Sequence, residues 1–84
     1  MTHGPFSGRE IVKVMVNSGI YEWDRTRGDH AILQWEPPAG HDTPARTVVV
    51  PLHDEVDMGT LRGIAEQAGA KEFDRFCAWI DENR

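Results

Sequence analysis

The stretch IYEWDRTRGDHAILQWE, residues 20–36, decides the fold of this chain. Residues 20–26 are rich in aromatic and β-branched side chains, which favour a strand. Gly28 and Asp29 come next, and both residue types are typical of turns. From His30 to Glu36 apolar and polar side chains alternate, which predicts a second strand. The stretch therefore predicts two antiparallel strands joined by a tight turn.

A third strand is expected over residues 46–52, where the run Val48–Val50 has the strongest β preference in the chain and suggests a well-covered position in the sheet. Pro51 has no amide proton to donate, so it belongs at the end of a strand or on an edge. Residues 37–44 are dense in proline and glycine and show no periodicity, so they are expected to form an exposed loop between the second and third strands.

The alternation also assigns faces to the predicted strands. In the second strand Ala31, Leu33 and Trp35 should meet the helices, which leaves His30 on the opposite, solvent-reached face. In the first strand four alternate residues should share one side: Tyr21, Trp23, Arg25 and Arg27. Arg25 and Arg27 should therefore point the same way. The two aromatic side chains of this set are expected in the core, with a partner-binding surface as the alternative.

Three helices complete the predicted order. Ser7 and Glu10 fit a capping box that opens a helix over residues 8–18, and Gly19 ends it. A second helix is expected over residues 58–68, and a third carries apolar side chains at helical spacing: Phe73, Phe76, Cys77 and Ile80. The order of helix, three-stranded antiparallel meander and two helices predicts an α+β two-layer sandwich.

Length and composition limit the function classes. The 84 residues suit one domain spanning 1–84, and no apolar run is long enough to span a membrane. The first residues lack the pattern of a signal peptide, so a cytoplasmic location is expected. The single cysteine, Cys77, is expected to be buried and excludes a thiolate metal cluster. A net charge of −5 argues against a general nucleic-acid binder.

His30 is the strongest candidate for chemistry, because an imidazole can exchange a proton near neutral pH and here it follows Arg25 and Arg27 closely. A base beside fixed positive charge suits phosphodiester cleavage. His53, next to Asp54 and Glu55, could supply a second proton or take part in a metal site, but the spacing matches no zinc pattern. His41 in the loop and His3 near the N-terminus are expected to be solvated.

The chain resembles the HicA-type toxins of bacterial and archaeal toxin-antitoxin modules. The resemblance covers almost the whole chain and rests on an ordered set of motifs: residues 7–13 (SGREIVK), Gly19, residues 25–30 (RTRGDH), residues 48–53 (VVVPLH), residues 59–62 (GTLR) and residues 67–69 (QAG).

The resemblance implies a fold like a double-stranded-RNA-binding domain and a metal-independent endoribonuclease that cuts messenger RNA, needs no cofactor and is blocked by a HicB-type antitoxin. It implies that His30 is the catalytic histidine. Arg25 and Arg27, two apart on a strand, could hold the phosphate together with Gly28, or the arginines could be ordinary solvated charges at the strand end. Family members usually have a small hydroxyl residue where this chain has Asp29. That carboxylate could orient the imidazole or repel the incoming phosphate.

Two further hypotheses stay open. The chain could bind RNA or a protein partner without cutting, which its acidic composition and Asp29 favour. It could also have lost nuclease activity and act only as a partner of its antitoxin, through Tyr21 and Trp23. Separately, the helix start at residues 59–62 could hold a phosphate at its amides or be an ordinary helix start.

Overall fold

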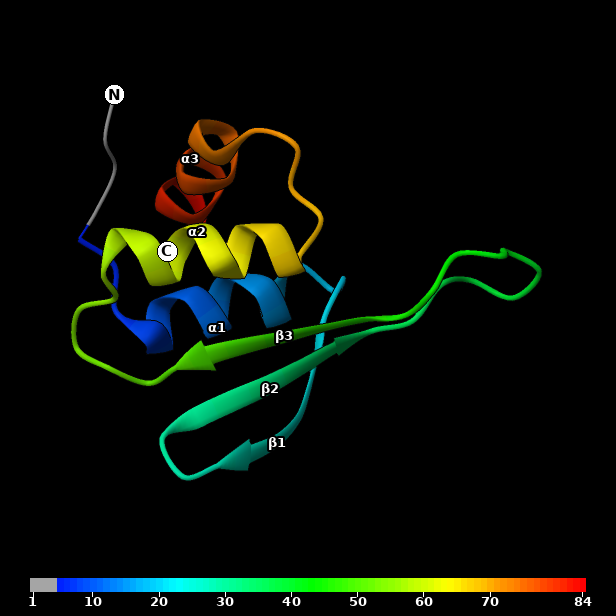
Figure 1. Cartoon of the computed structure of the whole chain (residues 1–84), viewed down its shortest axis with the longest axis horizontal. Coiled ribbons are helices and arrows are strands. Elements are labelled where there is room, and N and C mark those ends of the chain that lie inside the picture. The colour runs from blue at the N-terminus through cyan, green and yellow to red at the C-terminus, as the bar shows by residue number, and fades with distance from the viewer. Residues whose placement is uncertain (1–4) are drawn as a thin grey trace.

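The computed structural model describes residues 5–84, which form a three-stranded sheet with helices packed on one side (Figure 1). The elements follow in the order α1 (Gly8–Asn17), β1 (Glu22–Arg27), β2 (His30–Trp35), β3 (Arg46–Pro51), α2 (Met58–Gln67) and α3 (Phe73–Asn83). The predicted α+β order is confirmed. His3 lies outside the described residues. None of the helices in residues 5–84 has the length and hydropathy that a membrane span requires.

The sheet is antiparallel with β2 in the middle, between β1 and β3. Ala31 and Leu33 are fully buried against the helices, while His30 keeps part of its surface in solvent, as the alternation predicted. Helices α1 and α2 contact the sheet, and α3 packs on α1 and α2 (Figure 1). The loop between β2 and β3 extends away from this body. The central strand therefore carries core residues on one face and His30 on the other.

Strand β1 differs from the prediction because it contains a bulge. It begins at Glu22, and its register shifts between Trp23 and Arg25, so Asp24 has no partner on β2. A bulge adds one residue to one strand and reverses the alternation beyond it. Trp23 and Arg25 consequently lie on opposite faces, and the expectation that Arg25 and Arg27 share a side with Trp23 is wrong. The two arginines still share a side with each other.

The two aromatic residues of this region have different environments. Tyr21 is buried, and its hydroxyl donates to the backbone carbonyl of Ala68, with 3.2 Å between the oxygens. Trp23 is 46% exposed, so its expected place in the core is wrong. Its indole N–H donates to the Thr26 hydroxyl at 3.0 Å. Tyr21 therefore links this end of the sheet to the helices through a buried side chain, whereas Trp23 lies half-exposed beside α1.

Strand β3 is an edge strand that the helices cover. Val48 and Val50 are fully buried, which confirms the covered position that the valine run predicted. The amide of Val49, on the free edge, donates to the side-chain oxygen of Gln67 at 2.9 Å. Pro51 is the last residue of the strand, where its missing donor costs no ladder hydrogen bond. Helix α2 thus closes an edge that would otherwise be open to pairing.

The core lies between the helices and the sheet and includes the buried thiol of Cys77, as predicted. Its members come from every element except β1 and from the segments beside these elements: Phe6, Ile11, Val12, Val14, Met15, Tyr21, Ala31, Leu33, Val48, Val50, Val56, Leu61, Ile64, Ala65, Phe76, Cys77 and Ile80. Ile32 is buried as well but points to the other face of β2. The face that carries His30 therefore also contains an apolar side chain.

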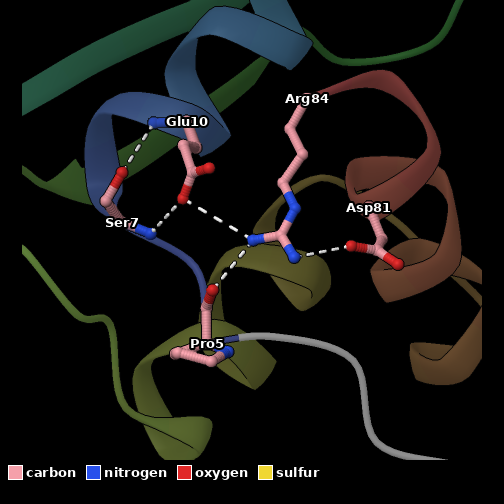
Figure 2. Close-up of polar contacts among 5 residues, drawn as sticks. All are labelled: Pro5, Ser7, Glu10, Asp81 and Arg84. Carbon is pink, nitrogen blue, oxygen red and sulfur yellow. Dashed lines mark hydrogen bonds and ion pairs between the residues drawn. The ribbon is translucent and has the colours of Figure 1, made fainter.

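The start of α1 is held by a capping box that the C-terminal arginine extends (Figure 2). The Ser7 hydroxyl accepts from the Glu10 amide at 3.1 Å, and the Glu10 carboxylate accepts from the Ser7 amide at 2.9 Å. Arg84 donates to the carbonyl of Pro5 at 2.8 Å and pairs with Glu10 at 3.7 Å and with Asp81 at 2.7 Å. The end of α3 is thereby tied to the start of α1.

Gly8 brings α1 against the end of β3. Its amide donates to the carbonyl of His53 at 2.9 Å, and a Cβ at this position would overlap the carbonyl of Pro51. The backbones approach each other so closely that only a residue without a side chain fits. The position of His53 therefore depends on a glycine in the first turn of α1.

Replacing Gly8 with alanine is expected to lower the free energy of unfolding by about 1–3 kcal/mol, because the added methyl group must displace backbone. Gly63→Ala is the matched control, since Gly63 is also helical and has open space at its Cβ position. That variant should be more stable by up to about 1 kcal/mol through helix propensity. Urea unfolding of both variants measures the difference. Equal effects would contradict the close approach.

The Glu10 carboxylate should make folding pH-dependent in acid. Its pKa lies below the ordinary glutamate value of 4.5, chiefly because it accepts the Ser7 amide. A carboxyl with a lowered pKa in the folded state stabilises the fold above its unfolded value, and this stabilisation is lost as the pH falls through the folded value. The stability advantage of the wild type over Glu10→Gln should therefore shrink below about pH 4.5 in thermal melts. A difference that stays constant in acid would contradict this.

Candidate active site

The candidate site is built on the hairpin turn between β1 and β2. Arg27 and His30 face each other as the last pair of the hairpin, and Gly28 and Asp29 form the turn. Gly28 has a φ of +61°, whereas Asp29 has a negative φ. A positive φ at the first central residue alone is typical of a type II′ turn, which favours glycine there. The tight turn at Gly28 therefore places Asp29 directly between the end of β1 and the start of β2.

The end of β3 brings a second histidine to this turn. His30 pairs with Pro51 across the β2–β3 ladder, and the amide of Leu52 then donates to the carbonyl of Asp29 at 2.6 Å. This bond continues the pairing by one residue beyond the strand. The next residue, His53, consequently lies beside the turn although it is 24 positions from Asp29 in the sequence.

The Asp29 carboxylate lies between two imidazoles. Its Oδ1 is 2.8 Å from Nδ1 of His30, and its Oδ2 is 3.1 Å from Nε2 of His53. The ring centroids are 6.4 Å apart with an interplanar angle of 67°. The His53 contact is a hydrogen bond when Nε2 carries a proton, and the His30 contact is an ion pair when the ring is protonated. The sequence predicted His30 as the catalytic residue with Asp29 and His53 as possible auxiliaries, and the structure brings all three together as one connected group.

This group is open to solvent and electrostatically coupled. The exposed fractions of the side chains are 45% for His30, 62% for Asp29 and 56% for His53. The pKa of Asp29 is lowered first by the hydrogen bond from His53, and then by its own backbone amide and by charge on the two histidines, while slight burial opposes these effects. The Asp29 carboxylate therefore interacts electrostatically with both imidazoles.

The two arginines predicted at the site have different surroundings. Arg27 lies opposite His30 on the same face of the sheet and is exposed to solvent. Arg25 lies opposite Ile32, further along the strand, and its guanidinium pairs with the carboxylate of Asp24. Arg27 is therefore the arginine next to His30, and the charge of Arg25 is engaged by its neighbour.

A further carboxylate near the group, Asp57, was missed by sequence reasoning. It caps α2 by accepting from the Thr60 amide at 2.7 Å, and this contact is the main reason its pKa is lowered, with charge on His53 as a small further cause. An aspartate just before a helical run is a capping pattern and could have revealed it. Because Asp57 occupies this helix start, the idea of a phosphate at residues 59–62 is not supported.

Part of the acidic charge gathers at the other end of the hairpin. Glu22, Asp24 and Glu36 line a hollow of about 750 Å³ together with Gly19, Ile20, Gln34 and Trp35. Glu22 pairs with Gln34, so it lies at the opposite end of β1 from the turn. At about 3.3 Å per residue, this end of the strand is roughly 16 Å from Arg27. In residues 5–84, no group of three or more histidine, cysteine, aspartate or glutamate side chains could hold a metal ion.

Comparison with known proteins assigns a family to this fold and site. The sequence model of the family described as the HicA toxin of bacterial toxin-antitoxin systems matches residues 8–70, well over half of the chain. The chain belongs to the HicA toxin family. No curated protein and no solved structure matches the chain. As a HicA toxin, the chain is the toxin of a toxin-antitoxin pair, and its partner is an antitoxin. The matched residues include the whole group of His30, Asp29 and His53.

The contacts of Asp29 make a prediction about imidazole tautomers. When neutral, His30 should carry its proton on Nδ1 and His53 on Nε2, because these are the nitrogens that face the carboxylate. In Asp29→Ala, His30 should lose this preference. Long-range proton–nitrogen NMR spectra distinguish the tautomers, and the exposed His41 serves as an internal reference. An Nε2–H tautomer for His30 in the wild type would contradict the geometry.

Proposed function

We propose that this HicA toxin is a metal-independent endoribonuclease that cleaves messenger RNA in the cytoplasm, with His30 as its catalytic histidine. The observation that carries the proposal is the 2.8 Å contact between Asp29 and Nδ1 of His30. The carboxylate faces Nδ1 of a half-exposed imidazole, and Nε2 is the nitrogen left for a substrate. The family assignment to a toxin of a toxin-antitoxin pair supports an activity that harms the cell.

The contact suits His30 to act as a general base. A neutral imidazole that donates Nδ1–H to a carboxylate has its lone pair on Nε2, where it can accept a proton. The carboxylate also stabilises the imidazolium that forms after the proton is taken, as in other carboxylate–histidine pairs. Asp29 is therefore a positioning residue for His30. Of the two effects considered for this carboxylate, orientation of the ring is the one that the geometry supports.

Arg27 is the residue best placed to bind the phosphate. It lies across the strand pair from His30 on the same face, and its guanidinium can form two parallel hydrogen bonds to phosphate oxygens. Gly28 adds a backbone amide beside it in a turn without a side chain. Arg25 belongs to the same face but is paired with Asp24, so its role is secondary. Fixed cations at this position stabilise the charge that develops on the phosphate.

The reaction proposed is transesterification within the RNA. Nε2 of His30 removes the proton of a ribose 2′-hydroxyl, and the 2′-oxygen attacks the adjacent phosphorus. The bond from phosphorus to the 5′-oxygen breaks, giving a 2′,3′-cyclic phosphate on one fragment and a 5′-hydroxyl on the other. The 2′-hydroxyl is the nucleophile, so the substrate must be RNA and not DNA.

The antitoxin proposed as partner is HicB-like and acts by covering this group. The residues that would meet RNA are exposed side chains at one end of the sheet, and a protein bound there would exclude the substrate. An acidic or aromatic side chain of the antitoxin placed against Arg27 would suit this contact. The antitoxin and RNA would then compete for the same surface.

The test is cleavage of a defined messenger RNA by the purified chain in the presence of a chelator. The wild type should cut it, with cyclic phosphate ends, and should arrest growth when expressed alone. His30→Ala should fold normally and lose cleavage by about 10²–10⁴-fold, the usual contribution of a general base. Arg27→Ala should lose about 10²–10³-fold.

His41→Ala is the matched control, because His41 is exposed in the loop between β2 and β3 and should leave cleavage unchanged. Full activity in His30→Ala would remove the proposed mechanism. If the wild type shifts RNA in a gel without shortening it, the chain is a non-catalytic binding domain.

A further inference from the structure

We propose that His53 is the general acid of the reaction and protonates the departing 5′-oxygen. This role rests on the proposed nuclease function and extends it from one proton-transfer residue to two. It follows from the position of His53 against Asp29 and His30. The three side chains form a connected chain of contacts from imidazole to carboxylate to imidazole.

The geometry leaves one nitrogen of each ring free for the substrate. Asp29 contacts Nδ1 of His30 and Nε2 of His53, so Nε2 of His30 and Nδ1 of His53 are the remaining nitrogens. The ring centroids are 6.4 Å apart, and both rings are about half exposed. An in-line displacement needs a base at the attacking oxygen and an acid at the leaving oxygen, on opposite sides of phosphorus. In this proposal the bound phosphate lies across the two rings, with its attacking oxygen at Nε2 of His30 and its leaving oxygen at Nδ1 of His53.

The charges around the two rings assign the roles. The group contains one carboxylate, Asp29, which contacts both rings. His53 is also close enough to Asp57 for its charge to contribute slightly to the lowered pKa of that carboxyl. Asp54 and Glu55 follow in the chain and are exposed. More carboxylates therefore surround His53 than His30, and the proposal gives His53 the role of proton donor and His30 that of proton acceptor.

Backbone contacts hold His53 in this position. Its carbonyl accepts from the Gly8 amide at 2.9 Å, and the preceding amide, of Leu52, donates to the carbonyl of Asp29 at 2.6 Å. These bonds join the first turn of α1, the end of β3 and the hairpin turn. These two hydrogen bonds fix the backbone at His53. A general acid and a general base that act on one phosphate must keep a constant distance from each other, and a fixed backbone helps to maintain it.

The proton that His30 takes up and the proton that His53 gives away balance each other within this group. His30 takes the proton of the 2′-hydroxyl as the bond from the 2′-oxygen to phosphorus forms. His53 gives its proton to the 5′-oxygen as the bond from phosphorus to that oxygen breaks. One positive ring is present before and after the step, so the carboxylate of Asp29 balances the same total charge throughout. Exchange with water then returns each ring to its starting state.

The experiment compares two RNAs that differ in one atom. In the first, the scissile linkage is natural. In the second, sulfur replaces the 5′-bridging oxygen, and its thiolate leaves without being protonated. His53→Ala should slow cleavage of the natural RNA by about 10²-fold or more, but slow cleavage of the sulfur RNA only a few-fold. With the wild type, the rate on the natural RNA should fall at alkaline pH as the acid loses its proton, and the sulfur RNA should show no such fall.

The outcomes distinguish the acid role of His53 from the nuclease function on which it rests. Equal losses on both RNAs, or no loss on either, would overturn the acid role and leave the nuclease intact. The wild-type pH profiles decide the same question if His53→Ala is unstable, because matching alkaline falls on both RNAs would also overturn it. A wild type that cuts neither RNA would overturn the nuclease proposal itself. His41→Ala should match the wild type on both RNAs.

Discussion

The close approach of α1 to the end of β3 at Gly8 is the constraint on which the site depends. A side chain there would overlap the Pro51 carbonyl, and the Gly8 amide instead binds the carbonyl of His53. The capping box and Arg84 hold this first turn of α1 in place (Figure 2). The helical layer and the sheet thus meet beside the hairpin turn. Here, contacts between backbone groups hold the residues that carry the exposed side chains of the site.

The group at the turn joins residues that are distant in the sequence through a single carboxylate. Asp29 contacts His30, its neighbour, and His53, which arrives at the end of β3. An exposed aspartate beside a phosphate site would ordinarily repel the substrate. In the proposed mechanism both of its oxygens face imidazole nitrogens, so that it orients the rings and balances their charge instead. The acidic side chains of Glu22, Asp24 and Glu36 gather at the far end of the hairpin, which keeps part of the negative charge away from the group.

The sequence was sufficient for the order of elements, because capping residues, glycines and alternation act locally. Ser7 and Glu10 mark the start of α1, and Ala31 and Leu33 correctly identify the buried face of β2. The face of Trp23 could not be predicted, since a bulge at Asp24 depends on pairing with β2. The link from His53 to Asp29 also required the register of β2 and β3, which no local pattern reports. His30 was predicted as the reactive residue, and that role still awaits an activity measurement.

The most direct test of the proposed mechanism is a crystal structure of the chain with a messenger-RNA fragment that carries a single 2′-deoxy residue at the mapped cleavage site. Without the 2′-hydroxyl the RNA stays intact while its phosphate can still bind. We expect this phosphate to lie beside Nε2 of His30 and the guanidinium of Arg27, with the contact between Asp29 and Nδ1 of His30 preserved. RNA bound on another face, or an imidazole of His30 turned away from both Asp29 and the phosphate, would contradict the mechanism.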